Sequence, residues 1–242
     1  MSLALPMKTL IRTLAVFGVL AVAGRAQVVD AYWDFSGGES GSDSPAWLPD
    51  NITGGRISWG NEYGDNNPGF NSSHSSAERY PGASGGHNAN IAITGGAALN
   101  IDSSTYFEFK LKPAGGYQLS ATSFQLGSFS EEDGPKTLTL LASTDCFATY
   151  TTLGSPVTVA ADGSWHLVVF SGVSSTWDAD TRVTFRLYGT NGSGRDDNSN
   201  WRIDDVSLGV VAVPEPPTWA AMLLGVALLG ARAWRRRKAP AV

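Results

Sequence analysis

Apolar and polar residues alternate along most of this chain, which predicts strands. Between residues 28 and 209 no segment shows the 3.6-residue apolar repeat of an amphipathic helix. In the run 105–112, Phe107, Phe109 and Leu111 alternate with polar or amphipathic neighbours, so these three side chains should face a core. We expect further strands over residues 28–35, 56–59, 90–94, 117–129, 137–143, 165–171, 182–188 and 201–208.

The last of these strands changes its period part-way. Trp201 and Ile203 occupy odd positions, whereas Val206 and Leu208 occupy even ones. A β-bulge at Asp204-Asp205 would return all four side chains to one buried face. Roughly eight antiparallel strands without a helix predict an all-β, two-sheet antiparallel jelly-roll-like sandwich.

Both ends of the chain differ from this pattern. Lys8 and Arg12 precede a short apolar run at 14–23. Gly24-Arg25-Ala26 follows, with small residues at positions −3 and −1 before the expected cleavage site. This is the pattern of a signal peptide cleaved after Ala26, because the apolar run is too short to span a membrane. Residues 1–26 are therefore assigned to a signal peptide and residues 27–212 to the sandwich.

Residues 213–238 contain three blocks in order: a proline-flanked tripeptide, an apolar run and a basic cluster. At ~1.5 Å per residue the apolar run covers about 25 Å, just short of a ~30 Å hydrocarbon core. Cations directly after such a span hold the C-terminus on the cytoplasmic side of the membrane. The same cations argue against the alternative of a helix buried in a protein core, because a buried helix would not tolerate four of them directly after it. The blocks are Pro214, Glu215 and Pro216, a transmembrane helix over about 218–234, and Arg235, Arg236, Arg237 and Lys238.

This order resembles the PEP-CTERM sorting signal of Gram-negative bacteria. The resemblance covers the last part of the chain and implies recognition by a membrane-embedded exosortase. It further implies transient anchoring in the inner membrane, followed by transfer to the cell surface or the extracellular space. The signal is an address and implies no activity.

The charge of the mature part narrows the set of partners. Residues 27–213 hold 9 Lys and Arg against 21 Asp and Glu, a net charge of −12. A surface this acidic disfavours nucleic acid and anionic membrane as partners. Cys146 is the only cysteine, so it forms no internal disulfide, and we expect it to be a small buried hydrophobe.

The span 107–208 resembles jelly-roll domains of the carbohydrate-binding-module and laminin-G-like kind. Those domains often close with a strand of the form Ile-Asp-Asp-Val-x-Leu, here Ile203 to Leu208. The resemblance bears on the fold first and hardly at all on the ligand. Exopolysaccharide is the partner that we expect if the domain binds a sugar.

Carboxylates crowd the region before and inside the closing strand, and calcium prefers six to eight oxygen ligands. A structural calcium could tie this strand to an early acidic loop, as in the sandwich families that the chain resembles. A solvated acidic turn beside a β-bulge explains the same residues equally well. The expected ligands are Asp196, Asp197, Asp204 and Asp205, with Asp34 and Glu39 from the early loop.

Exposed aromatic rings can stack on sugar rings, although core packing is the commoner role of any single one. The ligand-stacking candidates, all in or beside predicted loops, are Trp47, Trp59, Tyr63, Tyr80 and Trp177.

No residue pattern supports catalysis. Gly82-Ala83-Ser84-Gly85-Gly86 matches a nucleophile motif and His87 follows it, but the strand and helix that such an elbow requires are missing from the pattern. The adjacent Glu131 and Glu132 lack the separation that glycoside hydrolysis needs. We therefore expect no catalytic residue and a non-enzymatic exported surface or matrix protein. The alternatives are a secreted glycan-active hydrolase on the same fold and a purely structural matrix subunit.

Overall fold

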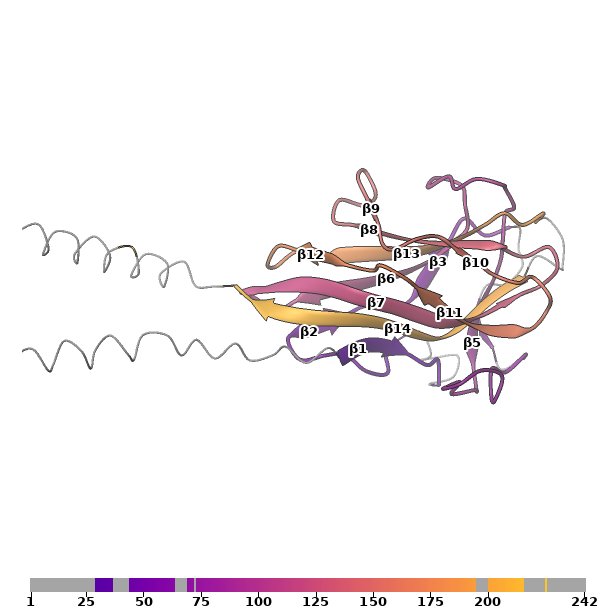
Figure 1. The fold of residues 1–242 in the computed structure, drawn as a ribbon, viewed down its shortest axis with the longest axis horizontal. Helices are drawn as coiled ribbons and strands as arrows, with labels where there is room; N and C mark the ends of the chain where they lie inside the picture. Colours follow the sequence, from indigo (N-terminus) through magenta and orange to yellow (C-terminus); the bar gives the residue numbers. More distant parts are fainter. Residues whose placement is uncertain are drawn as a thin grey trace, which may run out of the picture.

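In a computed structural model, the chain forms two facing antiparallel sheets (Figure 1). The structure describes residues 29–36, 44–63, 69–71, 73–194, 200–215 and 225. The predicted signal peptide, the span at 218–234 apart from residue 225, and the basic cluster at 235–238 lie outside them. Within the described ranges, no helix has both the length and the apolar character needed to cross a membrane.

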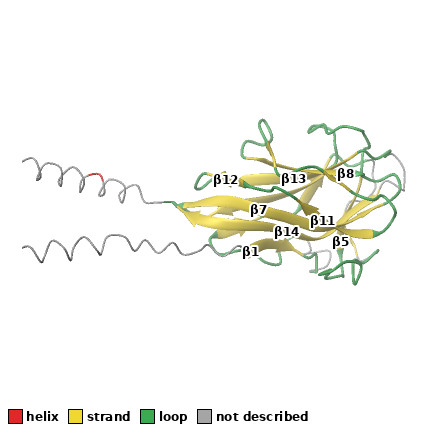
Figure 2. Cartoon of the chain, viewed as in Figure 1, coloured by secondary structure: helices red, strands yellow, loops and turns green. Residues whose placement is uncertain are grey.

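Strands account for the regular structure of the described sandwich, and loops join them (Figure 2). The strands are β1 Val29–Trp33, β2 Ile52–Gly54, β3 Ser58–Gly60, β4 Gly69–Asn71, β5 Asn88–Ala92, β6 Tyr106–Pro113, β7 Tyr117–Ser130, β8 Thr137–Ser143, β9 Thr151–Thr152, β10 Val157–Thr158, β11 Trp165–Phe170, β12 Ser175–Trp177, β13 Val183–Thr190 and β14 Asn200–Pro214.

Each sheet contains seven of these strands. The first sheet, called sheet A here, has the order β11-β7-β14-β5-β4, with β1 paired to β14 and β12 paired to β7. Sheet B has the order β10-β8-β13-β6-β2, with β3 paired to β6 and β9 paired to β8. The expected all-β, two-sheet antiparallel sandwich is confirmed.

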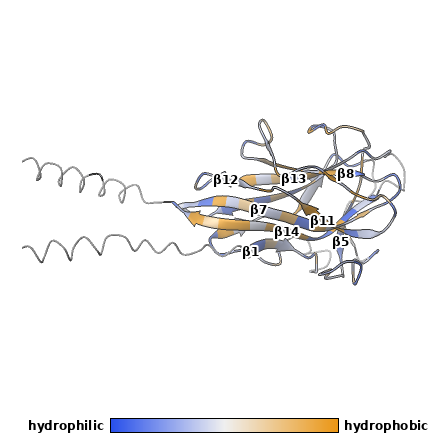
Figure 3. Ribbon diagram, viewed as in Figure 1, coloured by the Kyte–Doolittle hydropathy of each residue, from blue (hydrophilic) through white to orange (hydrophobic). Residues whose placement is uncertain are grey.

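The core lies between the sheets and is rich in aromatic rings. Phe109 of sheet B stacks on Phe185 at 5.6 Å and on Phe124 of sheet A at 5.8 Å, and Trp33 contacts the same ring at 5.3 Å. Phe107, Phe109 and Leu111 are all buried, as the alternation predicted. Apolar stretches run along β14, β13 and β8 (Figure 3), consistent with burial of one face of each sheet.

The closing strand contains the predicted bulge. The register between β14 and β7 shifts between Asp204 and Ser207, and Asp205 has a left-handed φ of 51°. The shift places the residues on either side of the bulge, such as Ile203 and Val206, on the same buried face. However, β14 continues to Pro214, beyond the predicted end at residue 208.

The prediction for Cys146 is wrong, because this side chain is exposed. It occupies the turn after β8 with a φ of 59°, and the adjacent Phe147 is buried instead. Asp145 organises that turn by accepting the backbone N–H of Thr149 at 2.9 Å.

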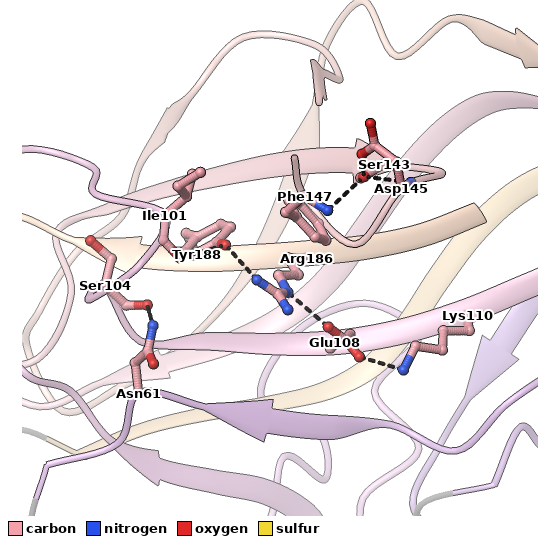
Figure 4. A network of polar contacts seen from close by, with 10 residues as sticks. All are labelled: Asn61, Ile101, Ser104, Glu108, Lys110, Ser143, Asp145, Phe147, Arg186 and Tyr188. Carbon is pink, nitrogen blue, oxygen red and sulfur yellow. Dashed lines mark hydrogen bonds and ion pairs between the residues drawn. The ribbon is translucent and has the colours of Figure 1, made fainter. Parts of the chain in front are cut away.

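A charged network covers the outer face of sheet B (Figure 4). The Arg186 guanidinium lies between the Tyr106 and Phe147 rings, 4.0 and 4.1 Å from their centroids, and donates to Glu108 at 2.7 Å. Burial alone would raise the pKa of Glu108, but its bonds from Lys110 and Arg186 bring that pKa below its usual value. Glu108 accepts from both Lys110 and Arg186, so the network ties β6 to β13.

Candidate functional site

The candidate site lies on the outer face of sheet A, beneath the segment 73–87 that joins β4 to β5. This segment is called the covering loop here. Its anchors are polar: Ser76 donates to Asp204 at 2.6 Å, and the indole N–H of Trp165 donates to the carbonyl of His74 at 2.7 Å. At its end, the Asn88 side chain donates to the carbonyl of Ser73 at 2.9 Å.

Asp205, at the bulge, is the central acceptor of this site. The Tyr32 hydroxyl donates to its Oδ1, while the Tyr80 hydroxyl and the Ser84 N–H donate to its Oδ2 at 2.5 and 3.0 Å. Burial and these bonds to Asp205 raise the pKa of both tyrosines far above the usual value, so both hydroxyls remain protonated donors. One carboxylate thus ties β1, β14 and the covering loop together.

Asp204, the other half of the pair, is fully buried under the covering loop. Burial, with the neighbouring charge on Asp205, raises the pKa of Asp204 to about 8, although the bond from Ser76 acts in the opposite direction. Desolvation therefore favours the protonated, neutral form of the Asp204 carboxyl near neutral pH.

A glycine on β7 lets the covering loop approach the sheet closely. A Cβ at Gly127 would overlap the Tyr80 hydroxyl and ring, so only glycine admits this ring against the strand. On its other side Tyr80 faces Trp165, with ring centroids 6.3 Å apart. The Tyr80 ring is consequently held in one position.

Two cavities flank the covering loop. One, of about 310 Å³, is lined by His74, Arg79, Phe129 and Trp165. The other, called the tyrosine groove here, is also about 310 Å³ and combines two aromatic rings, hydrogen-bonding groups and one exposed leucine. The lining residues used below are Asp30, Tyr32, Tyr80, Gln125, Leu167 and Ser207.

Trp47 extends the aromatic surface beside this groove. It forms an antiparallel bridge with Tyr32, with backbone N–H to O=C distances of 3.0 and 3.2 Å. Residues directly opposite in such a pair project from the same face, so Trp47 shares the outer face with Tyr32. Its side chain is 60% exposed, unusually high for an indole.

The five aromatic residues proposed to stack on ligands have different environments. Tyr80 lines the tyrosine groove, and Trp47 lies next to it. Trp59 and Trp177 pack against the core, where they contact Phe70 and Phe185. Tyr63 is exposed and is not one of the residues that line the groove.

Several groove residues were missed from the sequence. Asp30 and Tyr32 alternate with buried Ala31 and Trp33, so their outward direction was readable from the pattern. In the structure they lie next to Ser207, whose hydroxyl donates to Asp30 at 2.5 Å. This contact requires the pairing of β1 with β14, which the sequence alone did not specify.

The expected calcium ligands are only partly within the described chain. Asp204 and Asp205 lie side by side, but both oxygens of Asp205 already accept hydrogen bonds, and the Asp34 carboxylate accepts from Ser36 at 2.9 Å. Over the described ranges, no three His, Cys, Asp or Glu side chains form a metal-ligand group. Asp196, Asp197 and Glu39 lie outside those ranges, so calcium binding stays a prediction.

The residues of the catalytic-looking motif have structural contacts. The Ser84 hydroxyl donates to the carbonyl of Gly85 at 3.3 Å, and among the described residues no hydrogen bond connects it to His87. Glu131 accepts from the Asn200 side chain at 3.2 Å, and Asp133 accepts from the Ser193 hydroxyl. Glu131 and Asp133 thus have separate partners.

Buried Asp204 should make stability depend on pH. Its folded pKa of about 8 exceeds the usual aspartate value of 3.8, so between those values the folded chain binds one proton more than the unfolded chain. The free energy of unfolding should therefore fall as pH rises through this window. Chemical unfolding at about pH 5 and about pH 9 should show this fall in the parent and a smaller one in Asp204→Asn. Substitution of exposed Asp102 by Asn should leave the parent's fall unchanged, and an equal fall in parent and Asp204→Asn would contradict the assignment.

If calcium binds, excess chelator should lower the melting temperature, because a ligand that binds only the folded chain stabilises it by mass action. A variant with Asp196 and Asp197 replaced by Asn should lose this response. An identical melting curve with and without chelator would contradict a stabilising calcium. The hydrogen bonds of the acid pair would then account for this region without a metal.

Comparison with known proteins adds a motif and a set of similar folds. No curated protein sequence matches the chain. Similar solved structures include the family 11 carbohydrate-binding module of a Clostridium thermocellum cellulosomal cellulase (12% identity, TM-score 0.33, covering 78% of this chain and 98% of that chain). Others are the K3 cleaved adhesin domain of Lys-gingipain from Porphyromonas gingivalis (16%, 0.32, 75% and 99%) and a chain described as "CBM4 structure and function" (19%, 0.32, 51% and 70%). Residues 212–238 match the PEP-CTERM protein-sorting motif, so the chain carries the sorting signal of an exported protein.

Proposed function

We propose that this chain is a non-enzymatic surface or matrix protein whose sandwich binds a polysaccharide along the tyrosine groove. The supporting observation is the meeting of Tyr32, Tyr80 and exposed Trp47 with the polar groups of Asp30 and Gln125 on one sheet face. Sugar rings offer apolar faces to aromatic side chains and hydroxyl groups to carboxylates and amides. A cavity of about 310 Å³ lies within the range of small-ligand sites.

The fixed position of the rings favours binding. Because Asp205 holds both tyrosine hydroxyls, little side-chain freedom is lost when a ligand arrives, and less binding energy is spent on ordering. The same bonds occupy the hydroxyls, so ligand contact falls to those parts of the two rings that line the groove.

Sorting is the second part of the proposal. The motif at 212–238 supports recognition by an exosortase, transient retention in the inner membrane, and transfer to the cell surface or beyond. Binding and sorting are separable, because the groove residues and the tripeptide occupy different parts of the chain.

Replacing Trp47 by Ala should weaken polysaccharide binding at least about tenfold, or about 1.4 kcal/mol, as loss of an exposed aromatic contact commonly does. The measurement is retention of the purified domain on a glycan array, followed by calorimetry on the best ligand. Tyr150→Ala is the matched control, since Tyr150 is a half-exposed aromatic residue just before β9 of sheet B. Retention of no glycan favours a structural subunit, and turnover of a retained glycan favours the hydrolase.

Replacing Pro214, Glu215 and Pro216 together by Ala should leave a membrane-retained precursor, because the enzyme that reads the tripeptide loses its recognition element. Fractionation of cells that process the parent chain measures this. Ala replacement of exposed Thr149, Tyr150 and Thr151 is the control and should not alter release. Unchanged release of the tripeptide variant would refute the sorting role.

A further inference from the structure

The sorting motif begins inside the folded sandwich. Its match starts at residue 212, and β14 runs to Pro214. Beyond it, the Glu215 N–H donates to the carbonyl of Gly116 at 3.0 Å. Two residues of the Pro-Glu-Pro tripeptide are therefore held by the start of β7 and the turn before it. The paired residues are Ala212 with Leu119, Val213 with Gln118, and Pro214 with Tyr117.

This last part of β14 is weakly attached. Val210 and Val211 are buried, but Val213, Pro214 and Glu215 are exposed. Pro214 has no N–H to contribute to the ladder. On the other side of β14, the described pairing with β1 ends at Val210, so β7 is the only described strand neighbour beyond that point. A terminal segment with few buried contacts opens locally at low free energy.

Core packing sets the upstream limit of this segment. The register between β14 and β7 shifts a second time between Gly209 and Val210, and the two residues that follow the shift, Val210 and Val211, are still buried. Residues 212–215, if detached, would supply roughly 13 Å of extended chain. Detaching more would expose Val210 and Val211, which the core opposes.

Enzymes that read an extended peptide commonly pair with its backbone as an added strand. The backbone of this segment is already engaged by β7 and the preceding turn, so the two pairings exclude each other. We propose that residues 212–215 form a latch, which must leave β7 before the sorting enzyme can bind Pro214 and Glu215. This proposal rests on the sorting function proposed above and adds that the folded sandwich controls access to the signal.

A disulfide across the latch tests the proposal in the full-length chain. Val213→Cys with Gln118→Cys joins two register partners, and Cys146→Ser in every variant prevents stray pairing. Processing in cells that process the parent should be lost while this disulfide is closed, and regained after reduction. The matched control, Thr176→Cys with Ser120→Cys, joins β7 to β12 and should be processed as the parent is.

A flexible Gly-Ser insertion between Val213 and Pro214 distinguishes the latch from damage to the fold. In the closed Val213–Gln118 variant, this insertion frees the tripeptide and should restore processing. Parent-like processing of the closed variant without the insertion, confirmed as closed on a non-reducing gel, would overturn the latch, as would failure of the insertion to restore processing. Failure of the sorting role itself has a different signature, namely release that does not depend on the tripeptide.

Discussion

The carboxylate of Asp205 is the interaction on which the candidate site depends. It accepts hydrogen bonds from β1 and twice from the covering loop, and it can do so because the bulge in β14 turns its side chain to the outer face. Without the bulge, side chains would alternate strictly between the two faces of the strand. The apolar residues before the Asp204–Asp205 pair and those after it would then point to opposite faces, and the buried face would be interrupted. The irregularity that maintains the core thus also positions the acceptor.

Much of the fold was predictable because it follows from local alternation. The strand over Thr137–Ser143, the inward set of Phe107, Phe109 and Leu111, and the bulge at Asp204-Asp205 are all direct consequences of period-two patterning. The short strands β9 and β10 were missed, since two residues carry no readable period. The exposed position of Cys146 was missed because a left-handed turn residue has no signature in hydrophobicity.

The site was far less predictable than the fold. Asp205 is separated by 173 residues from Tyr32 and by 125 from Tyr80, and such partners are brought together only by sheet order. Nothing in the sequence pattern marks Gly127, yet the Tyr80 ring occupies the place of its missing side chain. The sequence predicted a metal at the acidic pair, and calcium binding stays a prediction. It did not predict that hydroxyl and N–H groups of the covering loop donate hydrogen bonds to these carboxylates.

Strand β14 carries both the bulge and the beginning of the sorting motif, and its length has a geometric consequence. Nine residues follow Asp205 up to Pro214, which at ~3.3 Å each is roughly 30 Å of extended strand. The groove therefore flanks the long axis of the sandwich, and the exit of the chain lies at its tip (Figure 1). If the molecule is tethered at this tip, the groove on its side stays accessible. A long polymer could then contact the grooves of a row of such molecules without obstructing the tether.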